Sequence, residues 1–162
     1  FGDDVDDPQY EPRDGDAAFL EVGSRIYEVT GYEPSFRVAA VVDGEVLVYE
    51  ANTVDGAQTA ADLLDIGGKV DYIGINSPKD ETTELARIED PAEVERLVNM
   101  VLASEVNPDA RPRNDDEQIF VAFHLHDGSI VTRAFYPDSR LLWHGIIVPH
   151  AFAEAIRAAG DA

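Results

Sequence analysis

Two histidines separated by one residue, His124 and His126, are the side chains in this sequence with the clearest capacity for chemistry. In a strand, side chains at positions i and i+2 leave the same face, so the two imidazoles could bind one metal ion. His144 and His150 could add ligands if the fold brings them close. Polar residues exposed beside a turn give the same pattern, and the sequence has neither a cysteine nor a His-Glu-x-x-His spacing. We therefore expect no metal and no other cofactor, with His124 and His126 as the candidate ligands if a metal binds.

Other patterns that carry chemistry are absent or weak. No serine lies in a Gly-x-Ser-x-Gly turn. The segment Gly67-Gly68-Lys69 precedes an expected strand, whereas a phosphate-binding loop opens a helix. The acidic segments 76–81 and 109–117 contain oxygen ligands for Ca²⁺ or Mg²⁺, but their spacing is not that of an EF-hand loop, and solvated carboxylates are the favoured explanation. We assign no catalytic residue.

The composition limits the partners. The 162 residues include 33 Asp and Glu against 12 Lys and Arg, a formal net charge of −21, which repels DNA, RNA and anionic lipid. No apolar run reaches the roughly 18–20 residues that span a bilayer. Only Lys69 and Lys79 are lysines. The acidity has two open interpretations: a surface adapted to concentrated salt, or an arginine-biased genome combined with an acidic tail.

Two Asp-Gly pairs predict the β-hairpins that position these residues, because Asp-Gly favours a two-residue type I′ turn. Asp43-Gly44 joins the strands of the first hairpin, over 36–50, with Arg37 opposite Glu50. Asp127-Gly128 joins the strands of the second, over 118–136. In its first strand, four alternating residues are predicted to face the core: Ile119, Val121, Phe123 and Leu125. Their predicted cross-strand partners are Ile130, Thr132, Ala134 and Tyr136.

The opposite face of the second hairpin is unusually apolar for a solvated surface, because it is predicted to carry Phe120, His124, Val131, Arg133 and Phe135. Trp143, the only tryptophan, follows closely in sequence. Either another layer of the domain covers this face, which is the favoured alternative, or it binds a partner. The candidate partner surface is Phe120, Val131, Arg133, Phe135 and Trp143.

The best-marked helix begins after Asp90, with Pro91 at its first position and Glu93 completing a capping box. Its apolar stripe is Val94, Leu97, Val98, Val101 and Leu102. Two further helices are predicted, at 57–66 and after Pro149, and further strands at 24–30, 69–76, 82–88 and 141–148. This order predicts an α+β fold: an antiparallel sheet built from β-hairpins, with two or three helices packed mainly on one face.

The predicted domain organisation is a flexible acidic tether over residues 1–18, followed by a single α+β domain over 19–162. Because the sequence starts at Phe1, we expect a missing upstream segment, such as a signal peptide or a membrane anchor. The chain itself has no predicted transmembrane segment, so any tethering to a membrane would depend on that missing segment.

The layout resembles that of bacterial or archaeal secreted or lipoprotein-type accessory domains of unknown function. The resemblance covers most of residues 24–159, and it depends on five segments: 26–37, 72–76, 86–101, 120–136 and 143–156. It implies an exported or surface-tethered accessory domain.

These observations favour a non-enzymatic, secreted or surface-exposed binding domain, whose partner is a protein or a small ligand. A location in the cytoplasm of a salt-adapted organism is the alternative to an extracellular or cell-surface one. The alternative function is a metal-assisted hydrolase-type enzyme that uses His124, His126 and nearby carboxylates, and a third is a structural module of an exported assembly. An exposed apolar face would favour binding, whereas a concave site with converging titratable groups would favour an enzyme.

Overall fold

The computed structural model describes residues 20 and 23–160, which form two compact units that divide between Ala51 and Asn52. The sequence predicted one domain over 19–162. In the described residues, the first hairpin belongs to a sheet of its own, which shares no strand pairing with the second sheet. The single domain over 19–162 stays a prediction. The predicted tether over 1–18 lies outside the described residues.

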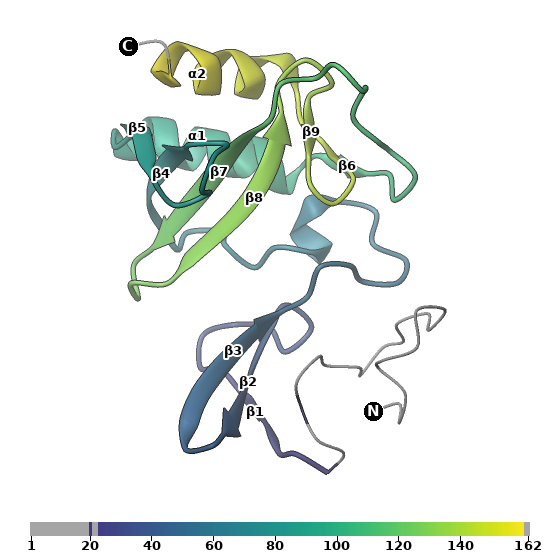
Figure 1. Ribbon diagram of the computed structural model, residues 1–162, viewed down its shortest axis with the longest axis vertical. Helices are drawn as coiled ribbons and strands as arrows, with labels where there is room; N and C mark the ends of the chain where they lie inside the picture. Colours follow the sequence, from purple (N-terminus) through teal and green to yellow (C-terminus); the bar gives the residue numbers. More distant parts are fainter. Residues whose placement is uncertain (1–19, 21–22, 161–162) are drawn as a thin grey trace. The chain divides into compact units, whose positions relative to one another are not determined.

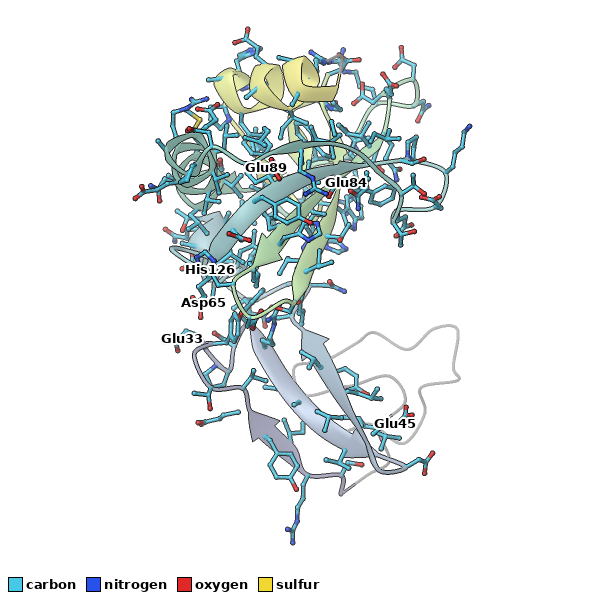
Figure 2. All side chains as sticks on the ribbon, turned by 90° about the vertical axis from the view of Figure 1, so that its left-hand side faces the viewer. Glu33, Glu45, Asp65, Glu84, Glu89 and His126 are labelled. Atoms are coloured by element: carbon cyan, nitrogen blue, oxygen red, sulfur yellow. The ribbon has the colours of Figure 1, made fainter. Side chains whose placement is uncertain are left out.

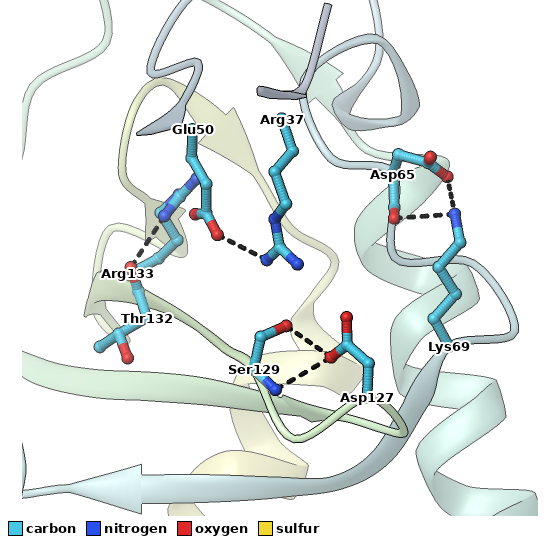
Figure 3. A network of polar contacts seen from close by, with 8 residues as sticks. All are labelled: Arg37, Glu50, Asp65, Lys69, Asp127, Ser129, Thr132 and Arg133. Atoms are coloured by element: carbon cyan, nitrogen blue, oxygen red, sulfur yellow. Dashed lines mark hydrogen bonds and ion pairs between the residues drawn. The ribbon is translucent and has the colours of Figure 1, made fainter. Parts of the chain in front are cut away.

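The N-terminal unit contains a three-stranded antiparallel sheet in the order β1-β2-β3, with β1 at Ile26–Glu28, β2 at Arg37–Val42 and β3 at Glu45–Glu50. Asp43 and Gly44 both have positive φ, at 52° and 84°, as a type I′ turn requires. The predicted pairing of Arg37 with Glu50 is confirmed, and Arg37 Nη2 lies 2.6 Å from Glu50 Oε1 (Figure 3).

The C-terminal unit is built on a seven-stranded antiparallel sheet in the order β5-β4-β7-β8-β9-β10-β6 (Figure 1). Its strands are β4 (Val70–Asn76), β5 (Glu84–Ile88), β6 (Glu105–Val106), β7 (Ile119–Leu125), β8 (Ile130–Tyr136), β9 (Leu141–Leu142) and β10 (Ile146–Ile147). The helices are α1 (Pro91–Leu102) and α2 (His150–Gly160), with a short 3₁₀ helix, η1, at Ala60–Asp62. The predicted α+β class with antiparallel sheets is therefore confirmed.

The helix α1 has the predicted Asp90 cap and Pro91 start, and Asp90 accepts a 2.9 Å hydrogen bond from the Glu93 backbone N–H, but the predicted return bond from the Glu93 side chain does not form. The Glu93 carboxylate pairs with Arg96 at 2.6 Å. Four residues of the predicted stripe are buried: Val94, Leu97, Val98 and Val101. They pack α1 against β4, while α2 contacts β4, β5 and α1. In the described residues, no helix is long and apolar enough to cross a membrane.

The helix predicted over 57–66 is only the single turn η1. The Asp62 carboxylate accepts hydrogen bonds from the backbone N–H groups of Gln58 and Thr59, which closes a capped turn. The buried residues that follow are Leu63, Leu64 and Ile66, and this spacing does not repeat with a helical period.

The second hairpin forms, but its predicted register is wrong by one residue. Its loop has three residues, because the Leu125 N–H donates to the Ser129 carbonyl and only Gly128 has positive φ. Asp127 Oδ1 braces the loop by accepting from the Ser129 N–H and hydroxyl (Figure 3). A one-residue shift moves every side chain of a strand to the other face. The observed pairs are therefore Ile119–Phe135, Val121–Arg133 and Phe123–Val131.

The strand predicted over 141–148 is interrupted. It forms β9 and β10, which pair with each other around a loop of Trp143, His144 and Gly145. Gly145 has φ +82°, and a Cβ there would lie 2.5 Å from the Asn107 carbonyl oxygen. Only glycine fits this loop without displacing the neighbouring backbone.

Candidate functional site

The predicted partner surface is not a single exposed face, and this prediction is corrected. Val131 and Phe135 are fully buried on the face of the sheet that also carries Val121 and Phe123. Phe135 contacts Phe152 of α2, with ring centroids 5.5 Å apart. Of the other three residues of the predicted partner surface, Phe120 is buried on the opposite face, and Arg133 and Trp143 are half-buried. The physical reason is the three-residue loop, which turns β8 over relative to the predicted register.

His124 and His126 have different neighbours. His124 Nε2 lies 3.7 Å from Glu84 Oε2, and its ring stacks on Tyr72 with centroids 3.9 Å apart. His126 is more exposed, and its Nδ1 lies 3.9 Å from Asp71 Oδ1. Among the residues that the structure describes, no group of three or more histidine, aspartate or glutamate side chains could hold a metal ion.

A polar cluster surrounds Gly74 at the centre of β4. A Cβ on Gly74 would lie 2.9 Å from Glu84 Oε2, 3.2 Å from His124 Nε2 and 3.3 Å from Asn76 Oδ1. These three side chains come from β5, β7 and β4, and Figure 2 marks Glu84 on its strand. We call Glu84, His124 and Asn76, arranged around Gly74, the Gly74 cluster. The register places them together, because Gly74 pairs with Ala122 and Asn76 pairs with Glu84.

Two atoms of the Gly74 cluster are buried and have no hydrogen-bond partner: Asn76 Oδ1 and His124 Nε2. Asn76 is only 6% exposed, and its Nδ2 donates to the Glu81 carbonyl at 2.8 Å. That hydrogen bond fixes the amide orientation, so the oxygen is the atom beside Gly74. Buried polar groups nearly always have partners, so two orphaned atoms around one point need an explanation.

The neighbours of the Gly74 cluster hold its side chains and set their charge. Glu84 Oε1 accepts a 2.6 Å hydrogen bond from Arg87 Nε, which leaves Oε2 directed toward His124. This hydrogen bond is the main cause that raises the pKa of Arg87. Burial lowers the pKa of His124, and the positive charge of Arg87 lowers it further, although Glu84 opposes the shift. The His124 imidazole is therefore neutral near pH 7.

A cavity of about 370 Å³ lies beside the Trp143–Gly145 loop. Its wall includes Leu63, Val106 and Trp143, with Arg111 and His144 as polar groups. His144 Nδ1 is buried without a hydrogen-bond partner. Burial lowers the pKa of His144, and the charges of two arginines lower it further, so the ring is neutral near pH 7. His150, in contrast, is exposed at the start of α2.

An exposed apolar face lies on the three-stranded sheet of the N-terminal unit. Val41 of β2 pairs with Val46 of β3. Ala39 of β2 pairs with Val48 of β3 and with Tyr27 of β1, so these side chains lie on one face of the sheet. These four residues are exposed by 53% (Val41), 68% (Val46), 55% (Val48) and 47% (Tyr27). We call Tyr27, Val41, Val46 and Val48 the valine face. The outer edge of β3 pairs with no other strand of the described chain.

The sequence reasoning missed the valine face and most of the Gly74 cluster. The two signals that it passed over are the run Val46-Leu47-Val48, which leaves both faces of a strand apolar, and the isolated Gly74 inside a predicted strand. Comparisons with protein-family models, with curated proteins and with solved structures each gave no match.

Proposed function

We propose that this chain is a non-enzymatic binding domain whose N-terminal unit takes up an extended segment of another protein along the edge of β3. The valine face is the single observation that carries this proposal. Exposed apolar patches on soluble proteins mark interaction sites more often than isolated apolar residues do. The resemblance noted above supports an exported or cell-surface setting for such a domain.

The N-terminal unit has little core of its own, which supports a role in binding. Among its described residues, only Phe36, Arg37 and Ala40 are buried. A sheet of few strands needs a covered apolar face to be stable in water. A strand added to the β3 edge would supply main-chain hydrogen bonds, and its alternate side chains would cover Val46 and Val48.

Charge favours a partner other than a second copy of this chain. The net charge of −21 makes two copies repel each other, and Glu45 begins β3, whereas Glu50 at the other end is already paired with Arg37. Figure 2 shows Glu45 beside the turn that joins β2 and β3. The best complement is a segment with an apolar middle and a basic residue at the end that lies beside Glu45; the lysine-ended peptide below supplies one in either strand direction.

The test uses two labelled synthetic peptides in a fluorescence-anisotropy assay with the full chain. Both peptides alternate valine with threonine, but one carries lysines at its ends and the other carries glutamates. We expect the lysine-ended peptide to bind more tightly. The double substitution Val46→Thr with Val48→Thr should weaken binding about tenfold or more, because burying one such side chain contributes about 1.5 kcal/mol or more.

The matched control is Leu47→Thr, which changes the same strand on its other face. Leu47 is 37% exposed and pairs with the buried Ala40. The Leu47→Thr variant should leave peptide binding unchanged. Equal weakening by both variants, or no preference for lysine ends, would refute the proposal. Sedimentation in a salt series tests whether the valine face binds a second copy of this chain. A wild-type dimer that dissociates when Val46 and Val48 are both changed to threonine would refute the proposed partner in favour of self-association.

The cavity beside Trp143 favours a second candidate function, the binding of a small ligand. Its apolar wall suits an aromatic group, while Arg111 and the unpartnered His144 Nδ1 offer polar contacts. An aromatic carboxylate matches both features, and Trp143 fluorescence would report its binding.

A further inference from the structure

We propose that the Gly74 cluster binds a divalent transition-metal ion, with Zn²⁺ the best fit, through His124 Nε2, Glu84 Oε2 and Asn76 Oδ1. This site lies in the C-terminal unit and does not depend on the peptide-binding role proposed above. It also differs from the His124–His126 pair that the sequence suggested.

The donor atoms support the assignment. All three can offer an electron pair to a cation, and two of them, Asn76 Oδ1 and His124 Nε2, are buried with no partner in the protein. A metal ion would satisfy both atoms at once.

The distances also suit a metal better than a direct contact. His124 Nε2 and Glu84 Oε2 are 3.7 Å apart, which is too long for a hydrogen bond. Two ligands at about 2.1 Å from a tetrahedral Zn²⁺ lie about 3.4 Å apart. The observed separation therefore needs to shorten by only a few tenths of an ångström. Gly74 makes the approach possible, because a Cβ would lie 2.9–3.3 Å from all three donor atoms.

Each ligand is held in place by a second contact, as is usual at metal sites. Arg87 binds the other oxygen of Glu84, and the Glu81 carbonyl fixes the amide of Asn76. The ring of Tyr72 lies flat on the ring of His124, with an interplanar angle of 13°. The site is thus organised before the ion arrives.

The ligand types select the ion. Mg²⁺ and Ca²⁺ prefer oxygen ligands alone, whereas an imidazole nitrogen favours Zn²⁺ and its neighbours in the first transition row. Three protein ligands leave a coordination position for water. The strongly negative chain also raises the local concentration of cations.

The experiment is calorimetric titration of the full, EDTA-treated chain with ZnCl₂ in about 1 M KCl, where separated surface carboxylates are screened. We expect one ion per chain. His124→Phe keeps an aromatic ring against Tyr72 but removes the nitrogen. Losing even an outer-shell partner lowers metal affinity about 10–100-fold, so this variant should lose at least about 100-fold. Cobalt(II) absorption bands that appear with wild type and not with His124→Phe provide a second readout.

The matched control is His126→Phe, the same substitution at the neighbouring histidine, which should bind Zn²⁺ as the wild type does. Gly74→Ala should block the site, and Glu84→Gln tests it with a side chain of equal size if Gly74→Ala does not fold. Thermal unfolding in EDTA checks that each variant is folded. The proposal is overturned if no saturable binding of one ion occurs, if His124→Phe leaves the affinity unchanged, if His126→Phe weakens it equally, or if Mg²⁺ competes as well as Zn²⁺ does.

Discussion

The register of the second hairpin can be tested by placing a hydroxyl on either face of β8. Val131 is fully buried and pairs with Phe123, whereas its neighbour Ile130 is 49% exposed and pairs with His124. Threonine has nearly the shape of valine, so Val131→Thr leaves no cavity but buries a hydroxyl among apolar side chains. An unsatisfied hydroxyl costs about 1–3 kcal/mol. Ile130→Thr removes only half-buried methyl groups and should cost less than about 1 kcal/mol.

The assay is urea unfolding followed by the fluorescence of Trp143, which is the only tryptophan and reports on the C-terminal unit. An unchanged denaturant dependence confirms that only the free energy of unfolding differs between variants. With a two-residue turn, Ile130 would face the core and Val131 would face outward. A larger loss in Ile130→Thr than in Val131→Thr would therefore contradict the three-residue loop.

Four further predictions concern other parts of the chain. Asp90→Ala should lower the free energy of unfolding by about 0.5–2 kcal/mol in the same assay, because α1 loses its N-cap. Burial lowers the pKa of His124 and of His144 below 6.5, so at acidic pH the unfolded chain binds more protons than the folded chain. The free energy of unfolding should therefore decrease as the pH falls below 6.5. Urea unfolding at several pH values should show a smaller decrease for His144→Phe. Gly145→Ala should lower the thermal midpoint and abolish quenching of Trp143 by aromatic carboxylates, because its Cβ would displace the Asn107 backbone. If acidic side chains repel one another at the surface, the midpoint should rise steadily toward about 1 M KCl, and a flat response would refute salt adaptation.

Where local residue chemistry decides a structure, the sequence was a sufficient guide. Asp90 and Pro91 locate the start of α1 because a capping side chain and a missing N–H act within one helical turn. Asp43-Gly44 fixes the first hairpin and its register, because both residues adopt the positive φ of a type I′ turn.

The second hairpin shows why the same dipeptide was not sufficient. Only Gly128 adopts positive φ there, and the loop begins one residue earlier, at His126. What decides between the two loops is the burial of β8: Val131 and Phe135 can fill the core, whereas Thr132 and Tyr136 would place hydroxyls in it. Turn propensity alone therefore predicted the hairpin but gave the wrong face. Reading the hydrophobic pattern of β8 together with the turn would have corrected it.

The Gly74 cluster could not be predicted from spacing, because its members are brought together only by the pairing of three strands. The His-x-His pattern identified His124 but suggested the wrong companion, since His126 lies beyond the end of β7 and beside Asp71. The informative residue was the glycine. An isolated glycine weakens a strand, so its presence inside β4 indicates that something approaches the backbone closely. In this fold that approach is made by Glu84 and His124, whose donor atoms would both contact a side chain at position 74. A search for glycines in predicted strands, followed by the polar residues opposite them, would therefore find such a site where ligand spacing does not.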